Sequence, residues 1–185
     1  MYKSTGGGTF CKAYESSLMN IKLIVLDVDG TLTDGKIIID NRSNEYKCFN
    51  ARDGFALSEA IKHGMEAAVI TGRQSSIVER RCRELGIKLI YQGVRNKAEV
   101  LKQIICDKKL SNNEVAYIGD DINDMGCMKM CGFKACPADA AVEIIRMCDY
   151  VAAKNGGEGA VREILEVILK SNGIWDRIID SFKNQ

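Results

Sequence analysis

The sequence predicts an α/β fold in which a Rossmann-like parallel sheet carries helices on both faces. From residue 21 onward, short apolar runs of strand length alternate with longer segments of helical periodicity. Several of these runs end abruptly in Gly, Asp or Thr, as a buried strand does where it leaves a sheet. This alternation gives a parallel sheet joined by right-handed crossovers. Ligands bind such sheets outside the carboxyl ends of the strands, so the polar residues that follow the runs form the candidate site.

The first strand leads into the most unusual part of the chain. Residues 21–26 are the first predicted strand, and the continuation DVDGTLTDG marks a tight turn. Two β-prone runs, residues 36–40 and 45–49, then flank the polar turn 41–44. This pattern predicts a β-hairpin, which leaves the turn directly and could act as a flap over the site.

The remaining predicted elements alternate regularly. A helix at residues 55–63, with Gly64 as its stop, follows the hairpin. The further predicted strands are residues 67–70, 88–91, 115–118, 133–136 and 150–152. The further predicted helices are residues 75–85, 96–106, a short segment ending near residue 130, 138–147 and 160–169. We find no internal repeat and no second domain in this alternation.

Length and composition shifts predict one domain with two appendages. A chain of 185 residues is long enough for one domain with a substantial core. We assign residues 20–171 to this domain, 1–19 to a flexible N-terminal arm and 172–185 to a C-terminal tail. The arm contains GGG and has mixed polarity, so we expect it to be foreign to the domain or a former linker to another one.

Composition argues against several kinds of protein. The formal net charge of +1 predicts no broad binding to nucleic acid or to membranes, and no apolar run approaches the length of a membrane span. The start lacks the charged-then-apolar pattern of a secretion signal. Eight cysteines without a CxxC pair favour free thiols and a cytoplasmic location. Cys127 and Cys131 could share a helix face and bind zinc, but small buried apolar residues are the favoured interpretation.

Two carboxylates, Asp27 and Asp29, follow the first strand. Buried carboxylates are costly unless a positive charge lies between them. A lone DxD would more often be a solvated turn, but DxDGTxTDG is a far more specific pattern. One carboxylate can attack phosphorus, and a second can protonate the leaving alcohol and then activate water. A divalent cation would neutralise the repulsion between carboxylate and phosphate.

Three later segments carry matching polar residues. Thr71 ends a predicted strand in ITGR, Lys97 opens a predicted helix after QGVRN, and Asp120 and Asp124 lie in GDDIND. Taken alone, the first would be an ordinary turn and the second a solvated charge. Neighbouring acids repel one another, so a metal ion is the simplest explanation for the third. Oxygen ligands beside a phosphate favour Mg²⁺ over zinc.

These four segments, in this order, resemble the motifs of the haloacid dehalogenase superfamily of phosphotransferases. The resemblance implies that Asp27 is the nucleophile and Asp29 the general acid/base. It implies a phosphate site of Thr71, Gly72 and Lys97. The implied Mg²⁺ ligands are Asp27, the backbone carbonyl of Asp29, and Asp120, and Asp124 is implied to support that shell or Lys97.

A narrower resemblance covers most of the chain. About twenty residues separate the first motif from the first helix, so the chain is expected to be capless, without a domain over the site. DVDGTLTDG, FNARDGF, ITGR, YQGVRNK, GDDIND and GGEGAVREI resemble the 3-deoxy-D-manno-octulosonate 8-phosphate (KDO 8-phosphate) phosphatases. Members form ring tetramers in which the hairpin and the C-terminal tail meet neighbouring subunits. The resemblance implies a phosphoric monoester hydrolase that forms an aspartyl phosphate, and a homotetramer.

Two other functions stay open. One is a phosphatase of nonulosonic (sialic-type) acid 9-phosphates, and the other is a non-catalytic tetramerisation module related to cytidylyltransferase fusions. Arg73 favours KDO 8-phosphate, because the nine-carbon relatives carry Glu there, and Glu84 does so too, because they tend to carry Lys. The GGEG sequence around Glu158 also resembles the nine-carbon relatives. Intact motif residues argue against a non-catalytic module.

Three arginines are the candidate substrate-binding residues. Arg73 lies two residues after Thr71, and Arg81 lies about two helical turns further on, so both can point along one face. Their planar guanidinium groups suit the carboxylate and hydroxyl groups of a sugar acid. Arg52 could approach from the same chain or a neighbouring one. For Arg52 and Arg81 the alternative is an ion pair on the surface or at an interface.

Overall fold

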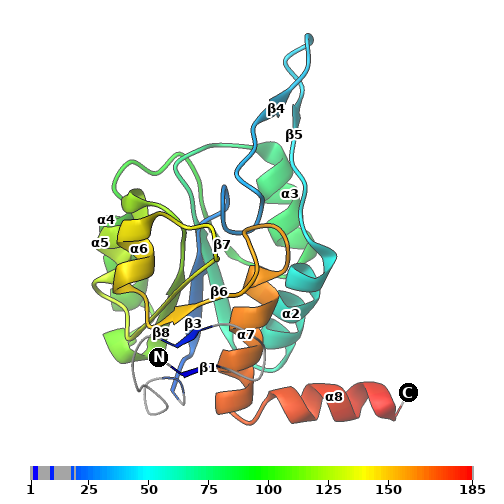
Figure 1. The fold of residues 1–185 in the computed structure, drawn as a ribbon, viewed down its shortest axis with the longest axis vertical. Helices are drawn as coiled ribbons and strands as arrows, with labels where there is room; N and C mark the ends of the chain where they lie inside the picture. The colour runs from blue at the N-terminus through cyan, green and yellow to red at the C-terminus, as the bar shows by residue number, and fades with distance from the viewer. Residues whose placement is uncertain (1, 4–8, 11–17, 19, 185) are drawn as a thin grey trace.

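The computed structural model describes residues 2–3, 9–10, 18 and 20–184, and its centre is a six-stranded parallel sheet (Figure 1). The strand order is β10-β9-β8-β3-β6-β7, with β3 and β8 paired at the centre. The parallel strands are β3 (Leu23–Leu26), β6 (Glu66–Ile70), β7 (Leu89–Tyr91), β8 (Val115–Ile118), β9 (Phe133–Cys136) and β10 (Tyr150–Val151). The predicted fold class is confirmed.

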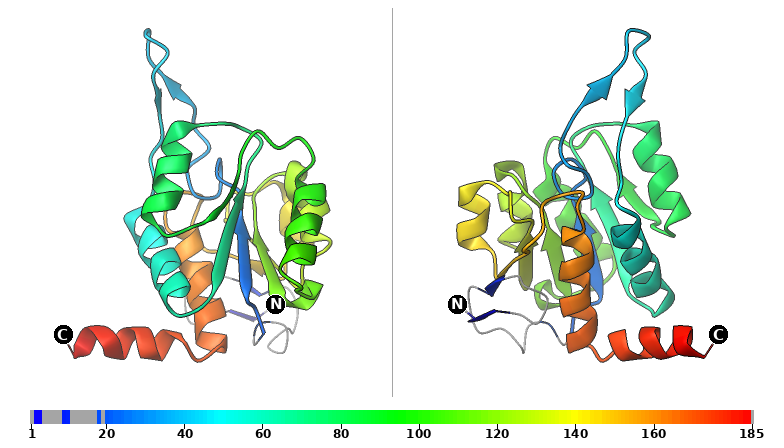
Figure 2. Two further views of the ribbon diagram at one scale, coloured as in Figure 1. Left: turned by 180° about the vertical axis from the view of Figure 1, so that it is seen from behind. Right: turned by 45° about the vertical axis from the view of Figure 1, so that its right-hand side comes forward.

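Successive residues of β3 point to opposite faces of the sheet, and all four of its side chains are buried. Ile24 and Leu26 join a cluster covered by α2, α3 and α7, whereas Leu23 and Val25 join one covered by α4, α5 and α6 (Figure 2). The helices are α2 (Ala51–Lys62), α3 (Ser76–Glu84), α4 (Lys97–Asp107), α5 (Met125–Met128), α6 (Val142–Met147) and α7 (Ala160–Ser171). A continuous apolar run therefore forms this strand because both faces are covered.

Helix α2 begins four residues before its predicted start. The side chain of Asn50 caps it by accepting a hydrogen bond from the backbone N–H of Arg52 at 2.9 Å. Gly54 precedes the predicted start but lies inside the observed helix, where an added Cβ would come within 2.3 Å of Arg81 Nη2. Close packing between α2 and α3, and not a turn, explains this glycine.

The hairpin predicted after the first strand is present. Strands β4 (Ile38–Ile39) and β5 (Glu45–Tyr46) pair antiparallel and project from the carboxyl end of the sheet (Figure 1). Its predicted action as a flap remains a prediction.

The two predicted appendages contain regular structure. Most of the arm at 1–19 lies outside the described residues, but Tyr2–Lys3 and Thr9–Phe10 form β1 and β2, antiparallel at the β10 edge. The C-terminal segment forms α8 (Trp175–Lys183), which lies at the opposite end of the domain from the hairpin (Figure 2). Trp175 and Ile178 are buried in the core of their own domain.

The seven cysteines of the described chain are free, and five of them are buried. Cys127 and Cys131 are among the buried ones, as predicted, whereas Cys48 and Cys106 are exposed. The cytoplasmic location remains a prediction. No helix among the described residues is long and apolar enough to cross a membrane.

Candidate active site

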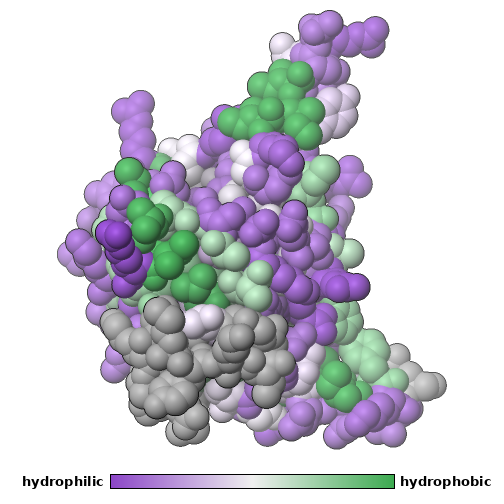
Figure 3. Space-filling view, in the orientation of Figure 1, coloured by the Kyte–Doolittle hydropathy of each residue, from purple (hydrophilic) through white to green (hydrophobic). Residues whose placement is uncertain are grey.

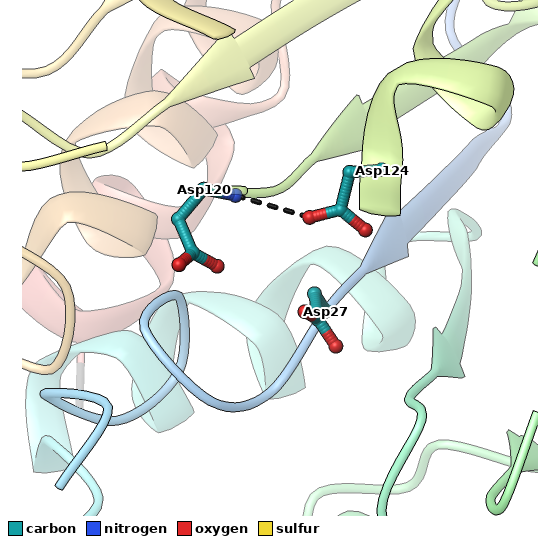
Figure 4. A group of neighbouring side chains, drawn as sticks. All are labelled: Asp27, Asp120 and Asp124. Carbon is teal, nitrogen blue, oxygen red and sulfur yellow. Dashed lines mark hydrogen bonds between the residues drawn. The ribbon is translucent and has the colours of Figure 1, made fainter. Parts of the chain in front are cut away.

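Three carboxylates converge at the carboxyl ends of the two central strands (Figure 4). Asp27 follows β3, Asp120 follows β8, and Asp124 ends the short 3-10 helix η2 (Ile122–Asp124). Their oxygens lie within 4.8 Å of one another. Residues far apart in the sequence meet here because β3 and β8 are parallel neighbours, so their ends coincide.

This cluster is suited to a divalent cation. Oδ1 of Asp27 is buried and has no hydrogen-bond partner in the described chain. Burial raises the pKa of Asp27 to about 6, with Asp124 adding to the shift, and burial raises the pKa of Asp120 to about 7. Only oxygen atoms are offered, which fits Mg²⁺ better than zinc. No cysteine cluster of this kind occurs among the described residues, so the zinc alternative receives no support there.

Lys97 supplies the positive charge within the cluster. It is 4% exposed, and its Nζ lies 2.8 Å from Asp27 Oδ2 and 2.8 Å from Asp124 Oδ1. Burial lowers the pKa of Lys97, but the charges of Asp124 and Asp27 outweigh that effect, and the pKa is raised overall. The predicted link between Asp124 and Lys97 is therefore present.

Asp124 is held by two further hydrogen bonds. Tyr117 donates its hydroxyl to Asp124 Oδ1 at 2.7 Å, and the backbone N–H of Asp120 donates to Oδ2 at 3.1 Å. Tyr117 was not predicted as a site residue. Its position in a buried apolar strand gives no sign that the hydroxyl reaches η2.

The loop after β3 fits closely against its surroundings. Gly30 has a φ of +91°, and a Cβ there would come within 2.0 Å of Asp120 Oδ2. Thr31 donates its hydroxyl to Asp120 Oδ1 at 2.9 Å. From the far end of the chain, Gly156 packs so tightly that a Cβ would lie 1.8 Å from the Gly30 carbonyl oxygen. The GGEG sequence, which the sequence analysis used only as a resemblance, therefore packs against the backbone of the loop after β3.

The side chain of Asp29 lies beside a different set of charged groups, and the sequence did not predict these contacts. Lys47, just after β5, forms an ion pair with Asp29 Oδ1, and Arg73 Nε lies 3.8 Å from Asp29 Oδ2. Arg73 Nη2 also lies 3.0 Å from Oε1 of Glu45 in the hairpin. Lys47 and Glu45 had only their β-prone context as a signal, which predicts a hairpin and not a contact.

The other predicted residues divide into two groups. Thr71, 2% exposed, directly follows β6, which pairs with β3, and therefore lies at the same edge of the sheet as Asp27. Arg81 packs between α2 and α3 and forms an ion pair with Glu84 at 3.5 Å. Arg52 lies exposed in the first turn of α2. The structure thus brings Thr71 to the site but does not join Arg81 or Arg52 to the carboxylates.

Comparison with known proteins gives consistent matches. A family model of haloacid dehalogenase-like hydrolases matches residues 87–165. The 3-deoxy-D-manno-octulosonate 8-phosphate phosphatase of Escherichia coli K12 is 41% identical over 157 residues, which cover 85% of this chain and 84% of the relative. The Yersinia pestis protein of the same name is 38% identical over 150 residues, covering 81% and 80%.

Solved structures agree with the sequence matches. The same phosphatase from Moraxella catarrhalis, crystallised with magnesium, phosphate and KDO, has a TM-score of 0.89 and 38% identity, covering 91% of this chain and 97% of that one. A cobalt-bound form from Haemophilus influenzae has a TM-score of 0.81 and 36% identity, covering 85% and 92%.

Proposed function

Since the chain belongs to the haloacid dehalogenase-like hydrolases, and within them to the family of 3-deoxy-D-manno-octulosonate 8-phosphate phosphatases, we propose that it hydrolyses this sugar-acid phosphate to the free sugar acid and phosphate with Mg²⁺. The observation that carries the proposal is the buried oxygen of Asp27. This oxygen has no hydrogen-bond partner among the described residues and belongs to the cluster with Asp120 and Asp124, while the other oxygen of Asp27 pairs with Lys97. A free, buried carboxylate oxygen at this place is suited to attack phosphorus.

The residues support a two-step reaction. Asp27 attacks the phosphorus, a new O–P bond forms, and the bond from phosphorus to the sugar oxygen breaks as Asp29 donates a proton to that oxygen. Asp29 then takes a proton from water, whose oxygen attacks the aspartyl phosphate and releases phosphate and Asp27. Thr71, Gly72 and Lys97 bind the phosphate oxygens. Mg²⁺, held by Asp27, Asp120 and the Asp29 carbonyl, supplies charge that offsets the repulsion between the anions.

A phosphate-release screen tests this proposal. Purified chain is assayed on KDO 8-phosphate, a nonulosonate 9-phosphate and unrelated sugar phosphates, with Mg²⁺ and with EDTA. We expect release to be fastest from KDO 8-phosphate and to stop with EDTA. Preference for the nonulosonate would favour the alternative substrate, and no release from any ester would contradict the phosphatase proposal.

Arg73 is the residue that we expect to select the substrate. Its side chain is 45% exposed beside Asp29, where it can reach the sugar acid. Arg73→Glu is expected to lower kcat/KM for KDO 8-phosphate by roughly 10- to 100-fold, the cost of a lost hydrogen bond to a charged group. The loss for p-nitrophenyl phosphate should be much smaller, because that ester has no sugar.

The control for this prediction is Arg80→Glu. Arg80 lies on α3 with a side chain that is 83% exposed, so the same charge change there should leave both substrates unaffected. Equal losses on both substrates from Arg73→Glu would show that Arg73 serves the phosphate or the fold. Arg81 and Arg52 remain weaker candidates, because the structure places them in α2 and α3 packing or in solvent.

We further propose a homotetramer in which the hairpin forms subunit contacts. Ile37, Ile38 and Ile39 are each about half exposed and form the apolar patch that Figure 3 shows in green on the hairpin, and Tyr46 is about half exposed as well. Such a patch on a hairpin of marginal stability favours a covering partner. The C-terminal tail was predicted to reach a neighbouring site, but Trp175 and Ile178 pack in their own domain, so only the exposed Phe182 end of α8 supports that part.

Light scattering tests the assembly. We expect the wild-type chain to have the mass of a tetramer at micromolar concentration, and Ile38→Asp to shift it towards smaller species. Val142→Asp, at an exposed apolar residue outside the hairpin, is the matched control and should leave the mass unchanged. A wild-type monomer would contradict the proposal.

A further inference from the structure

The hairpin reaches the site through a buried lysine, Lys47, that has no part in the chemistry proposed above. The Lys47 side chain is only 1% exposed, although it directly follows the exposed Tyr46 of β5. Moving an ammonium group out of water is costly unless carboxylates compensate for it. Two do so here. Lys47 pairs with Asp29 Oδ1, and its Nζ lies 3.6 Å from Glu45 Oε1.

These contacts belong to a closed ring of four charges. Oδ1 of Asp29 forms an ion pair with Lys47, and Oδ2 of Asp29 lies 3.8 Å from Arg73 Nε. Glu45 forms ion pairs with both cations, and its Oε1 lies 3.0 Å from Arg73 Nη2. The Asp29 carboxylate therefore faces a cation at each of its oxygens, one from the hairpin and one from the loop after β6.

Glu45 also fastens the ring to the domain. The pKa of Glu45 is lowered, most strongly by a hydrogen bond from the hydroxyl of Ser75, the residue that precedes α3, and then by Arg73. Ser75 is 7% exposed. The base of the hairpin is thus tied to a helix terminus as well as to the site, while its tip projects into solvent (Figure 1).

We propose that Lys47 is a positioning residue that holds the carboxylate of Asp29 in place for proton transfer. The proposal rests on the proposed function, because it concerns the acid/base step of that reaction. It makes the base of the hairpin part of the active site in the chain's own subunit. Proton transfer depends strongly on geometry, and a displacement of about 1 Å can lower a rate by roughly 10²-fold.

A role through Asp29 has a kinetic signature that a purely structural role lacks. A sugar alkoxide is a poor leaving group and needs the proton of Asp29, whereas p-nitrophenolate leaves without one. Hydrolysis of the aspartyl phosphate needs Asp29 for both substrates. Loss of positioning should therefore slow the first step only for the sugar phosphate, and the second step for both.

The test is pre-steady-state kinetics of Lys47→Met with Mg²⁺. For KDO 8-phosphate we expect kcat to fall roughly 10²-fold. For p-nitrophenyl phosphate we expect a burst of p-nitrophenolate approaching one per active site, followed by slow turnover, with a larger burst amplitude than in wild type. Lys47→Arg, which keeps the charge, should restore part of the lost rate.

Two controls make the result specific. Lys36→Met removes an exposed lysine that precedes the first strand of the hairpin. Among the described residues Lys36 forms an ion pair only with Asp34, so this variant should behave as wild type. In the Asp29→Asn background, Lys47→Met should cause little additional loss, because its target is already absent. Thermal unfolding checks that each variant is folded.

The outcomes separate this inference from the function on which it rests. Equal losses on both substrates without a larger burst, or a full additional loss in the Asp29→Asn background, would overturn the positioning role while leaving the phosphatase intact. If Lys47→Met does not fold, the same comparison with Lys47→Arg decides the question through the burst amplitude. A wild-type chain that hydrolyses neither ester would overturn the proposed function itself, before any variant is measured.

Discussion

Replacing Asp27 by asparagine is expected to abolish turnover while the fold survives. The amide is a poor nucleophile and a weak metal ligand, so the first step loses its nucleophile and no aspartyl phosphate forms for the second step. In hydrolases that use a covalent intermediate, loss of the nucleophile costs on the order of 10⁴- to 10⁶-fold in kcat. The change is nearly isosteric, and burial already disfavours the charge of Asp27 by raising its pKa to about 6. Phosphate release measures the loss of turnover, and thermal unfolding of the same preparation shows whether the fold is retained.

The matched control for this variant is Asp107→Asn. Asp107 ends α4, is exposed, and accepts a hydrogen bond from Gln103 at 2.7 Å. Its replacement should leave kcat within a factor of two or so, as surface changes remote from a site generally do. Mg²⁺-dependent turnover in Asp27→Asn would exclude Asp27 as the nucleophile.

Lys97→Met is expected to lower the free energy of unfolding by about 3–5 kcal/mol in the absence of Mg²⁺, the usual cost of removing one partner from a buried ion pair. Asp27 and Asp124, 4% and 0% exposed, would then face each other without the cation that lies 2.8 Å from both. Phosphate release should also fall sharply, because Lys97 neutralises the phosphate. Chemical denaturation at neutral pH measures the free energy of unfolding. Addition of Mg²⁺ should raise this free energy more in Lys97→Met than in wild type.

Lys102→Met offers the same substitution on the same helix. Lys102 is exposed on α4, so a change of less than about 0.5 kcal/mol is expected. A loss below 1 kcal/mol for Lys97→Met would mean that the two carboxylates do not depend on Lys97 for compensation. The double variant with Asp124→Asn should be more stable than Lys97→Met, since it removes one of the stranded charges.

The sequence predicts the parts of the site that follow directly from strand ends. Asp27 and Thr71 each come immediately after a buried apolar run, and Asp120 follows its run after one glycine. Once the sheet is parallel, those ends share one edge, and the neighbouring strands β3, β6 and β8 bring the residues together. Local pattern and topology are sufficient here, because no side chain has to reach across an element whose angle is unknown.

The parts that could not be predicted depend on angles and packing between elements. Lys47 contacts Asp29 only because the hairpin leaves the sheet in one particular direction. Arg81 was predicted to face the substrate from its helical spacing, but α2 approaches α3 so closely at Gly54 that the guanidinium packs there. The spacing of residues along a helix predicts which face of that helix a residue occupies. It does not predict which neighbouring element packs against that face.

The contact between Gly156 and the loop at Gly30 also bears on when the enzyme can become active during its synthesis. All the proposed phosphate and metal residues, up to Asp124, leave the ribosome before the segment that packs against Gly30 and Thr33. N-terminal segments fold first during translation, and contacts between distant segments form late. A nascent chain that ends shortly after Asp124 would therefore carry every charged group of the site without the backbone that packs against this loop. We expect activity to be acquired in one late step, when the last third of the chain docks, and not gradually as the motifs emerge.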